Sequence, residues 1–152
     1  MLGNGEQVGQ VAERLRGGAA PVVALSGLEY EPDPPIRTSR ITALISRDGE
    51  RAVLGAARPS RAAGRGAGRL SSNVMTLAVD ELQPGEGVLL TTYRSDGREV
   101  AVAAPYDEVA VTAGDAAELL AGIWAALSPE YRVAAVVIDP AEGPGSLLRV
   151  AA

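Results

Sequence analysis

The segment from 29 to 41, E-Y-E-P-D-P-P-I-R-T-S-R-I, gathers groups that could do chemistry within one short stretch. It holds three carboxylates, two guanidiniums and three prolines, with the charges on Glu29, Glu31, Asp33, Arg37 and Arg40. Proline restricts a loop and so keeps its side chains in a preset geometry. Arginine binds phosphate or carboxylate through paired hydrogen bonds, and a partly buried carboxylate can act as an acid or base. The segment is therefore either one wall of a binding site or a surface turn whose acids and arginines pair with each other.

The residue types that the chain lacks narrow the chemistry further. The 152 residues include no histidine, no cysteine and no lysine, so all 14 cationic residues are arginines. A histidine acid or base, a thiolate nucleophile and a lysine Schiff base are thereby excluded. Any reaction must use Asp, Glu, Tyr, Arg, Ser, Thr or backbone groups. The net charge of −5 argues against nucleic acid or an anionic membrane as the main partner.

An arginine- and glycine-rich stretch at 58–69 departs from this acidic balance. Its arginines stand in the sequence R-P-S-R-A-A-G-R-G-A-G-R and are Arg58, Arg61, Arg65 and Arg69. This composition is typical of a flexible, solvated loop. A loop that contacts phosphate is the alternative interpretation.

The length of the chain suits one compact domain over 1–152. No apolar run reaches the roughly 18 uncharged residues that a membrane span needs. The N-terminus has no basic head before an apolar stretch, so we expect no signal peptide. The absence of cysteine fits a reducing compartment. We therefore expect a single-domain protein of the cytoplasm with no membrane partner.

The elements that must position the charged segment lie on both sides of it. Residues 5–16 carry apolar side chains at helical spacing, with Asn4 before them as a possible N-cap and two glycines after them as a stop. Residues 40–47 and 51–57 flank Asp-Gly-Glu, which predicts a β-hairpin with a tight turn. The charged loop should thus lead directly into a strand.

Further strands are expected after the arginine-rich stretch. The sequence S-N-V-M-T-L-A-V at 72–79 predicts a strand. Residues 88–93 and 98–104 are joined through Ser-Asp-Gly, which indicates a second hairpin with the same turn chemistry.

The last part of the chain predicts one more helix and two strands. Residues 115–127 place apolar side chains on one helical face, with Asp115 as the N-cap. The unbroken apolar run at 131–138 predicts a buried strand, and 146–150 should return beside it. The whole chain is therefore expected to be an α+β domain of mostly antiparallel strands with two helices.

The order of residues in the charged segment resembles that of the archaeal-type IMP cyclohydrolase family and its bacterial relatives. Members carry a pattern like Tyr/Phe-Glu-Pro-Asp-Ala-Pro-Asn-Tyr-Thr-Pro-Arg-Ile-Ser. The positions in register here are Tyr30, Glu31, Pro32, Asp33, Pro35, Thr38, Arg40 and Ile41. The positions that depart are Pro34, Ile36, Arg37 and Ser39.

Other stretches support the resemblance in the same order along the chain. G-N-G-E at 3–6 is similar to the family's Thr-Asn-Gly-Asp, and P-G-E-G-V-L-L-T-T-Y-R-S-D-G at 84–97 is similar to its Pro-Gly-x-Gly, strand and Thr-Tyr-x-Gly-Asp-Gly. The helix with Trp124 and the Arg132-Val133 that follows fit its Trp-x-x-Leu-Asn and Lys/Arg-Val segment. The resemblance thus spans nearly the whole chain.

Two departures bear on function. Where the family has Pro-x-Pro-Ser-Phe-x-Gly-Glu-Pro, this chain reads R-E-V-A-V-A-A-P-Y-D. The family's N-terminal motifs, Pro-Gly-Arg-Gly and Ser-Arg-Asn-Arg, are not found. The resemblance therefore implies that this sequence corresponds to the C-terminal portion of the family fold, which is a four-layer αββα sandwich like that of the N-terminal-nucleophile hydrolases.

The resemblance also implies a reaction and roles for individual residues. The family closes the purine ring of 5-formamidoimidazole-4-carboxamide ribotide with loss of water, which calls for no cofactor and no metal. By this resemblance Glu31 is the acid or base and Arg40 binds substrate or orients Glu31. Asn4, Thr38 and Tyr93 would be pocket groups, and Arg37, which is not a family residue, could add a phosphate contact.

Several hypotheses remain at this point. The chain is a cyclohydrolase-type enzyme, or the C-terminal subunit of one, that acts on a purine ribotide or related metabolite. Alternatively it is a non-catalytic binding or stabilising subunit of the same fold, or a scaffold whose likeness reflects ancestry alone. The first two imply a second protein chain that supplies the absent portion, or a homo-oligomer.

Overall fold

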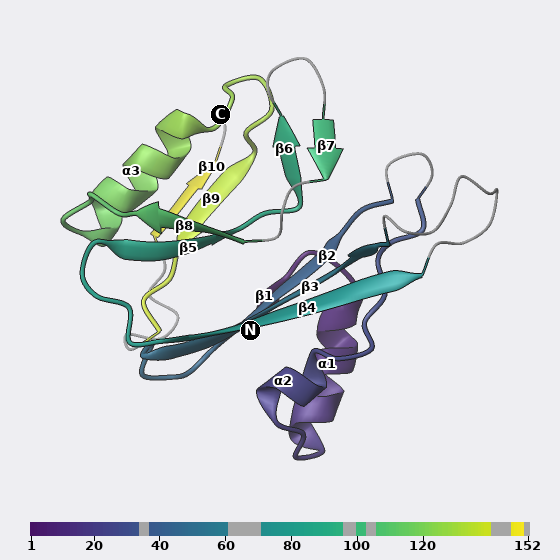
Figure 1. Cartoon of the computed structure of the whole chain (residues 1–152). Coiled ribbons are helices and arrows are strands. Elements are labelled where there is room, and N and C mark those ends of the chain that lie inside the picture. The colour runs from purple at the N-terminus through teal and green to yellow at the C-terminus, as the bar shows by residue number, and fades with distance from the viewer. Residues whose placement is uncertain (34–36, 61–70, 96–99, 103–105, 141–146, 151–152) are drawn as a thin grey trace.

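The computed structural model describes residues 1–33, 37–60, 71–95, 100–102, 106–140 and 147–150. Its first half is a four-stranded antiparallel sheet in the order β1-β2-β3-β4, with helices α1 and α2 against one face (Figure 1). These elements are β1 (Leu2–Gly3), α1 (Gln7–Arg16), α2 (Pro21–Ala24), β2 (Arg40–Ile45), β3 (Arg51–Pro59) and β4 (Ser72–Asp80).

The second half lies on the other side of this sheet and contains helix α3 (Figure 1). It consists of β5 (Glu86–Leu90), β6 (Tyr93–Ser95), β7 (Val100–Val102), β8 (Tyr106–Ala110), α3 (Ala116–Ala126), β9 (Ala134–Val137) and β10 (Leu147–Val150). All its strand pairs are antiparallel. The predicted α+β class with antiparallel strands is confirmed, whereas the likeness to the N-terminal-nucleophile hydrolases stays a prediction.

Helix α1 forms where its apolar spacing predicts it, but Asn4 is not its N-cap. Glu6 stands at the cap position and makes no side-chain capping bond. The Asn4 side chain instead donates to the Ser39 carbonyl, 35 residues away in the sequence. At the other end Gly18, with φ of +87°, adopts a conformation that glycine accepts readily and so ends the helix. The predicted cap therefore serves a tertiary contact.

The first hairpin is as predicted, with slightly different bounds. Strands β2 and β3 pair from Arg40 opposite Ala57 to Ile45 opposite Ala52. The turn requires Gly49 at φ +79°. Strand β3 continues to Pro59, so Arg58 belongs to a strand and the expected flexible loop does not begin at 58. The rest of that predicted loop, 61–70, lies outside the described residues.

The core lies between the two N-terminal helices and the first sheet. It is a cluster of buried aliphatic side chains: Val11, Ala24, Leu25, Leu28, Leu44 and Ala57. Gly55 lets α2 approach the sheet, because a Cβ there would lie 3.0 Å from Leu25 Cδ2. Short helix α2 begins at a proline, which suits the first helical position, and was not predicted. This core fixes β2, and therefore the charged loop that leads into it.

The second hairpin is only partly as predicted. Its strands are β6 and β7, which pair over Tyr93–Ser95 and Val100–Val102, and the turn between them lies outside the described residues. Residues 88–90 of the expected first strand belong to β5, which pairs with β8 instead. Local turn chemistry predicts the hairpin, whereas the pairing of β5 with a strand about 20 residues away depends on tertiary contacts.

The C-terminal elements correct one prediction about burial. Asp115 caps α3 as expected, since its carboxylate accepts a hydrogen bond of 2.8 Å from the Glu118 N–H. Strands β9 and β10 pair as expected. The run 131–138 is not buried, however: Val133 is 76% exposed and Val136 48%. An apolar run indicates that its side chains are more stable when buried, but it does not indicate that other parts of the same chain bury them.

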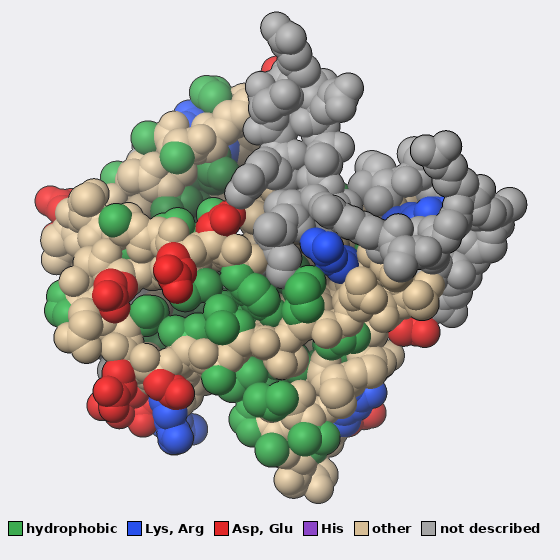
Figure 2. Space-filling model, viewed as in Figure 1, with side chains coloured by type: hydrophobic (Ala, Val, Ile, Leu, Met, Phe, Trp, Pro, Cys, Tyr) green, Lys and Arg blue, Asp and Glu red, His purple; other side chains and the backbone are tan. Residues whose placement is uncertain are grey.

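Apolar exposure extends across the second half. A hollow of about 580 Å³ between β4 and the β5–β8 pair is lined by Leu77, Val79, Leu82, Val88 and Val109, among others. Figure 2 shows hydrophobic side chains gathered in this region between the two halves. None of the described helices is long and apolar enough to cross a membrane.

Candidate functional site

The charged loop before β2 is closed on itself by hydrogen bonds. The Glu31 N–H donates to the Thr38 carbonyl at 2.9 Å, and the Arg37 N–H donates to the Asp33 carbonyl. The Asp33 carboxylate accepts from both the Thr38 N–H and the Thr38 hydroxyl, each at 2.6 Å. These two bonds, the hydroxyl first, hold the pKa of Asp33 below its usual value. The loop is thus a preset frame with Glu31 at one end and Thr38 at the other.

Two of the predicted site residues, Glu31 and Arg40, form an ion pair. Arg40 Nη2 lies 3.3 Å from Glu31 Oε2. The arginine side chain is only 13% exposed, whereas that of Glu31 is 43% exposed. Arg40 is therefore the fixed member of the pair, and Glu31 is the member that solvent or a ligand can reach.

Asn4 and Gly5 hold Arg40 in this position. Asn4 accepts a hydrogen bond from the Ile41 N–H at 2.8 Å and donates one to the Ser39 carbonyl at 2.8 Å. It therefore binds the backbone on both sides of Arg40. A Cβ on Gly5 would lie 1.4 Å from Arg40 Nη1, so the guanidinium packs directly on the glycine backbone. Strand β1, which pairs with β2, brings this short N-terminal segment alongside Arg40.

Tyr93 and Thr38 meet across the two halves of the molecule. The Tyr93 hydroxyl shares a hydrogen bond with the Thr38 hydroxyl. Beside them the Asn4 amide also donates to the Thr92 hydroxyl at 3.1 Å. The structure thus brings Asn4 and the Thr38–Tyr93 pair close together, since Asn4 bonds to Ser39 and Thr92, and their polar atoms bond to the protein itself. Whether they also touch a ligand stays a prediction.

Arg37 stands at a strained position in the same loop. Its φ of +55° lies in the left-handed region, which is uncommon for a residue with a side chain. The backbone bond to Asp33 accompanies this conformation. In the part of the chain that the structure describes, no hydrogen bond or ion pair joins its guanidinium to the Arg40–Glu31 pair, so its predicted phosphate contact is independent of that pair.

A pocket of about 330 Å³ opens beside Arg40. Its lining comes from α1 and the loop before β2: Glu6, Gln7, Gln10, Gly27, Glu29, Tyr30, Pro32 and Arg40. The volume is at the lower end of the range for small-molecule sites, about 300–1,000 Å³. Two carboxylates and one guanidinium make this lining acidic overall. The described residues contain no group of three or more acids suited to hold a metal ion.

Arg40 is the one lining residue of this pocket that was predicted from the sequence as a site residue, and Gln7 is the buried polar member that was missed. Its side chain is buried, with 4% exposed. Its amide nitrogen donates to the Ile41 carbonyl at 3.0 Å and lies 3.3 Å from the Thr42 hydroxyl. The sequence does carry one signal: Gln7 lies one helical turn before Val11, on the apolar face of α1. A polar residue at such a position indicates a specific hydrogen-bonding role.

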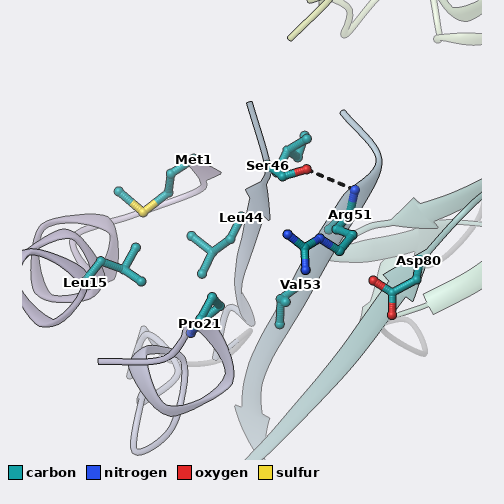
Figure 3. Close-up of a pocket in the computed structure, with 10 residues that line it drawn as sticks. Met1, Leu15, Pro21, Leu44, Ser46, Arg51, Val53 and Asp80 are labelled. Carbon is teal, nitrogen blue, oxygen red and sulfur yellow. Dashed lines mark hydrogen bonds between the residues drawn. The ribbon is translucent and has the colours of Figure 1, made fainter. Parts of the chain in front are cut away.

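A larger pocket lies near the other end of β2. It has a volume of about 620 Å³, and Met1, Leu15, Pro21, Leu44 and Val53 give it an apolar lining. Figure 3 shows the Arg51 guanidinium over this lining, with Asp80 to one side. Leu44 is four residues along β2 from Arg40, or about 13 Å. The apolar pocket is therefore distinct from the site beside Arg40.

Comparison with known proteins identifies the family. The model of the family described as IMP cyclohydrolase-like protein matches residues 1–143. The chain belongs to the IMP cyclohydrolase-like family. This membership supports a cyclohydrolase-like function in general terms. No curated protein and no solved structure matches this IMP cyclohydrolase-like chain.

Proposed function

We propose that this chain catalyses the closing of the purine ring, alone or as the catalytic part of a complex, on a purine ribotide or a closely related metabolite. The observation that carries the proposal is that Arg40, which lines a small pocket, forms an ion pair with Glu31, in a member of the IMP cyclohydrolase-like family. Arg40 is held rigidly and Glu31 is accessible, which suits a positioning cation beside a proton-transfer group.

The chemistry asked of these residues is modest. The carboxamide nitrogen attacks the formyl carbon, and a new N–C bond forms as the formyl C=O double bond becomes a single bond. The attacking nitrogen gives up one proton and the formyl oxygen takes one. The resulting hydroxyl then leaves as water as the formamido nitrogen gives up its proton. Glu31 would carry protons in these steps. Arg40 would bind a carbonyl oxygen, because a guanidinium donates hydrogen bonds to developing negative charge.

The charges of the pocket suggest how a ribotide would lie. Glu6 and Glu29 line it, so it disfavours a phosphate and suits the neutral heterocycle and the hydroxyl groups of a ribose. The phosphate would then lie outside, where Arg37 could reach it. Under this proposal no metal or redox cofactor takes part.

A second protein chain completes the site in this proposal. The hollow between β4 and the β5–β8 pair exposes apolar side chains next to the carboxylates of Asp80, Glu86 and Glu108, and β9 exposes further apolar side chains. A partner polypeptide with a complementary apolar face, or a second copy of the chain, would cover this surface. The absence of cysteine is consistent with a cytoplasmic location for such an assembly.

The test is ring closure by the protein recovered in its native assembly. Formation of the purine from 5-formamidoimidazole-4-carboxamide ribotide would be followed by ultraviolet absorbance. Glu31→Gln and Arg40→Ala are each expected to lower kcat/KM by about 100-fold or more, while the circular dichroism spectrum stays that of the parent. Glu13→Gln, on the exposed side of α1, is the matched control. Parental activity in both site variants would exclude this assignment.

A non-catalytic binding subunit is the second candidate, and one observation favours it. Asn4 and Thr38 bond to Ser39, Ile41, Asp33 and Tyr93, so they serve the protein frame as the structure stands. A binding subunit would show a higher Tm with the ribotide present and no consumption of it. If the assembly converts the ribotide and the Glu31→Gln variant does not, the chain is an enzyme and not a binding subunit.

A further inference from the structure

One buried polar atom beside the pocket lacks a partner. Gln7 is 4% exposed and lines the pocket with Arg40. Its Oε1 atom has no hydrogen-bond partner among the residues that the structure describes. A buried acceptor without a donor costs free energy, so such an atom calls for a function.

The orientation of the Gln7 amide follows from its neighbours. Its nitrogen lies 3.0 Å from the Ile41 carbonyl oxygen, which can only accept a hydrogen bond. A second acceptor, Asn4 Oδ1, lies 3.3 Å from the same nitrogen. Exchanging the nitrogen and oxygen of Gln7 would set oxygen against oxygen at both contacts. The free atom is therefore the oxygen, which is an acceptor.

This acceptor lies beside the guanidinium of Arg40. The ideal Cβ position of Gly5 is 1.4 Å from Arg40 Nη1 and 2.9 Å from Gln7 Oε1. The absence of a side chain at Gly5 thus leaves a donor and an acceptor near each other, with no hydrogen bond between them. Such a pair matches a ligand group that carries an acceptor and an N–H donor side by side.

We propose that Gln7 Oε1 and Arg40 together recognise the primary carboxamide of the ligand. The carboxamide oxygen accepts from Arg40, and its N–H donates to Gln7 Oε1. A carboxylate at the same place would satisfy Arg40 but would set a second acceptor against Gln7. This inference rests on the proposed function, since it names the group of the ribotide that Gln7 and Arg40 bind. It makes Gln7 the residue that determines carboxamide specificity.

The test compares two ribotides that lack the formyl group and so cannot close a ring. They are 5-aminoimidazole-4-carboxamide ribotide and 5-aminoimidazole-4-carboxylate ribotide, titrated into the native assembly by calorimetry. The carboxamide is expected to bind at least about tenfold more tightly, because the carboxylate leaves a buried acceptor unpaired. A preference below about threefold in the unmutated protein would overturn the proposal, and a trapped water would then be the partner of Oε1.

Gln7→Met keeps the length of the side chain and removes the acceptor. The preference for the carboxamide is expected to fall to near one, and carboxylate binding should not weaken. Gln83→Met makes the same exchange in the turn between β4 and β5 and should keep the full preference. An unchanged preference in Gln7→Met would also overturn the proposal. If that variant fails to fold, the comparison of the two ribotides in the unmutated protein decides.

The outcome is separable from that of the proposed function. Selective binding of the carboxamide without any ring closure would refute the enzyme and keep the role of Gln7. Ring closure with equal affinity for the two ribotides would keep the enzyme and refute the role of Gln7.

Discussion

At the scale of single residues, Arg40 depends on what lies around it. Long, flexible arginine side chains lose considerable entropy when they are held in one conformation. Here the backbone on both sides of Arg40 is bound by Asn4, and the guanidinium packs against Gly5. The ordering of Arg40 is therefore built into the fold before any ligand arrives.

Gly5→Ala should displace Arg40, because the new methyl group would occupy the place of the guanidinium. We expect kcat/KM for ring closure to fall by about 100-fold, as misplacement of a positioning group by about 1 Å can cause. Gly9→Ala is the control, since a Cβ there meets nothing within 4 Å. In helix α1 that exchange should raise the free energy of unfolding by roughly 0.5–1 kcal/mol. Equal activity of the two variants would show that Arg40 has no such role.

The sequence supports the prediction of some site residues better than others. Glu31 and Arg40 stand out by residue type, and the structure pairs them. Gln7 does not stand out, because its importance comes from an unpaired oxygen that lies near the guanidinium of Arg40, 33 residues away in the sequence. Asn4 was expected to cap a helix, since local patterns cannot reveal that its partners lie on β2 and beside it.

At the scale of elements, the loop before β2 is a small closed unit. Asp33 is its central acceptor, and the bonds from Thr38 favour its charged form. Because the pKa of Asp33 is lower in the folded chain, the stability from these bonds is present above the ordinary value of 3.8. It is lost as the pH falls through the lower folded value.

This predicts how an alanine at position 33 should behave. Asp33→Ala is expected to melt at a lower temperature than the parent at pH 7, and the gap in Tm should narrow as the pH falls below about 4. Thr38→Val removes one of the two donors and should show a smaller gap. Calorimetric melts from pH 7 down to pH 3 measure both. A gap that stays constant over this range would mean that the Asp33 charge does not stabilise the loop.

Some elements are specified by residues close to them in the sequence, and others by contacts with distant residues. Helix α3 with its Asp115 cap and the Asp-Gly hairpin depend on local chemistry, and both were predicted correctly. The pairing of β5 with β8 was not predicted, since an alternating strand does not reveal its partner. The run 131–138 was wrongly expected to be buried, because its apolar character says nothing about which surface covers it.

At the scale of the whole molecule, exposed apolar surface is the dominant feature. Among the described residues many large apolar side chains are exposed, including Val133 at 76%, Leu82 at 49% and Val136 at 48%, and surface of this kind marks sites where another protein binds. We therefore predict that the chain recovered from its own cells has a native mass well above 15.5 kDa. Light scattering after size-exclusion chromatography measures it, and mass spectrometry of the peak separates a second polypeptide from a second copy. A lone monomer would refute the predicted assembly.

The residues that hold Arg40 in place have a sequence order that bears on folding during synthesis. Asn4, Gly5, Gln7 and Glu31 all precede Arg40, and the strand that they hold ends at Ile45. Chains leave the ribosome N-terminus first, and their parts can fold as they emerge. The wall that carries the ion pair can therefore assemble on the nascent chain once β3 is available, while β5 to β10 are still being synthesised.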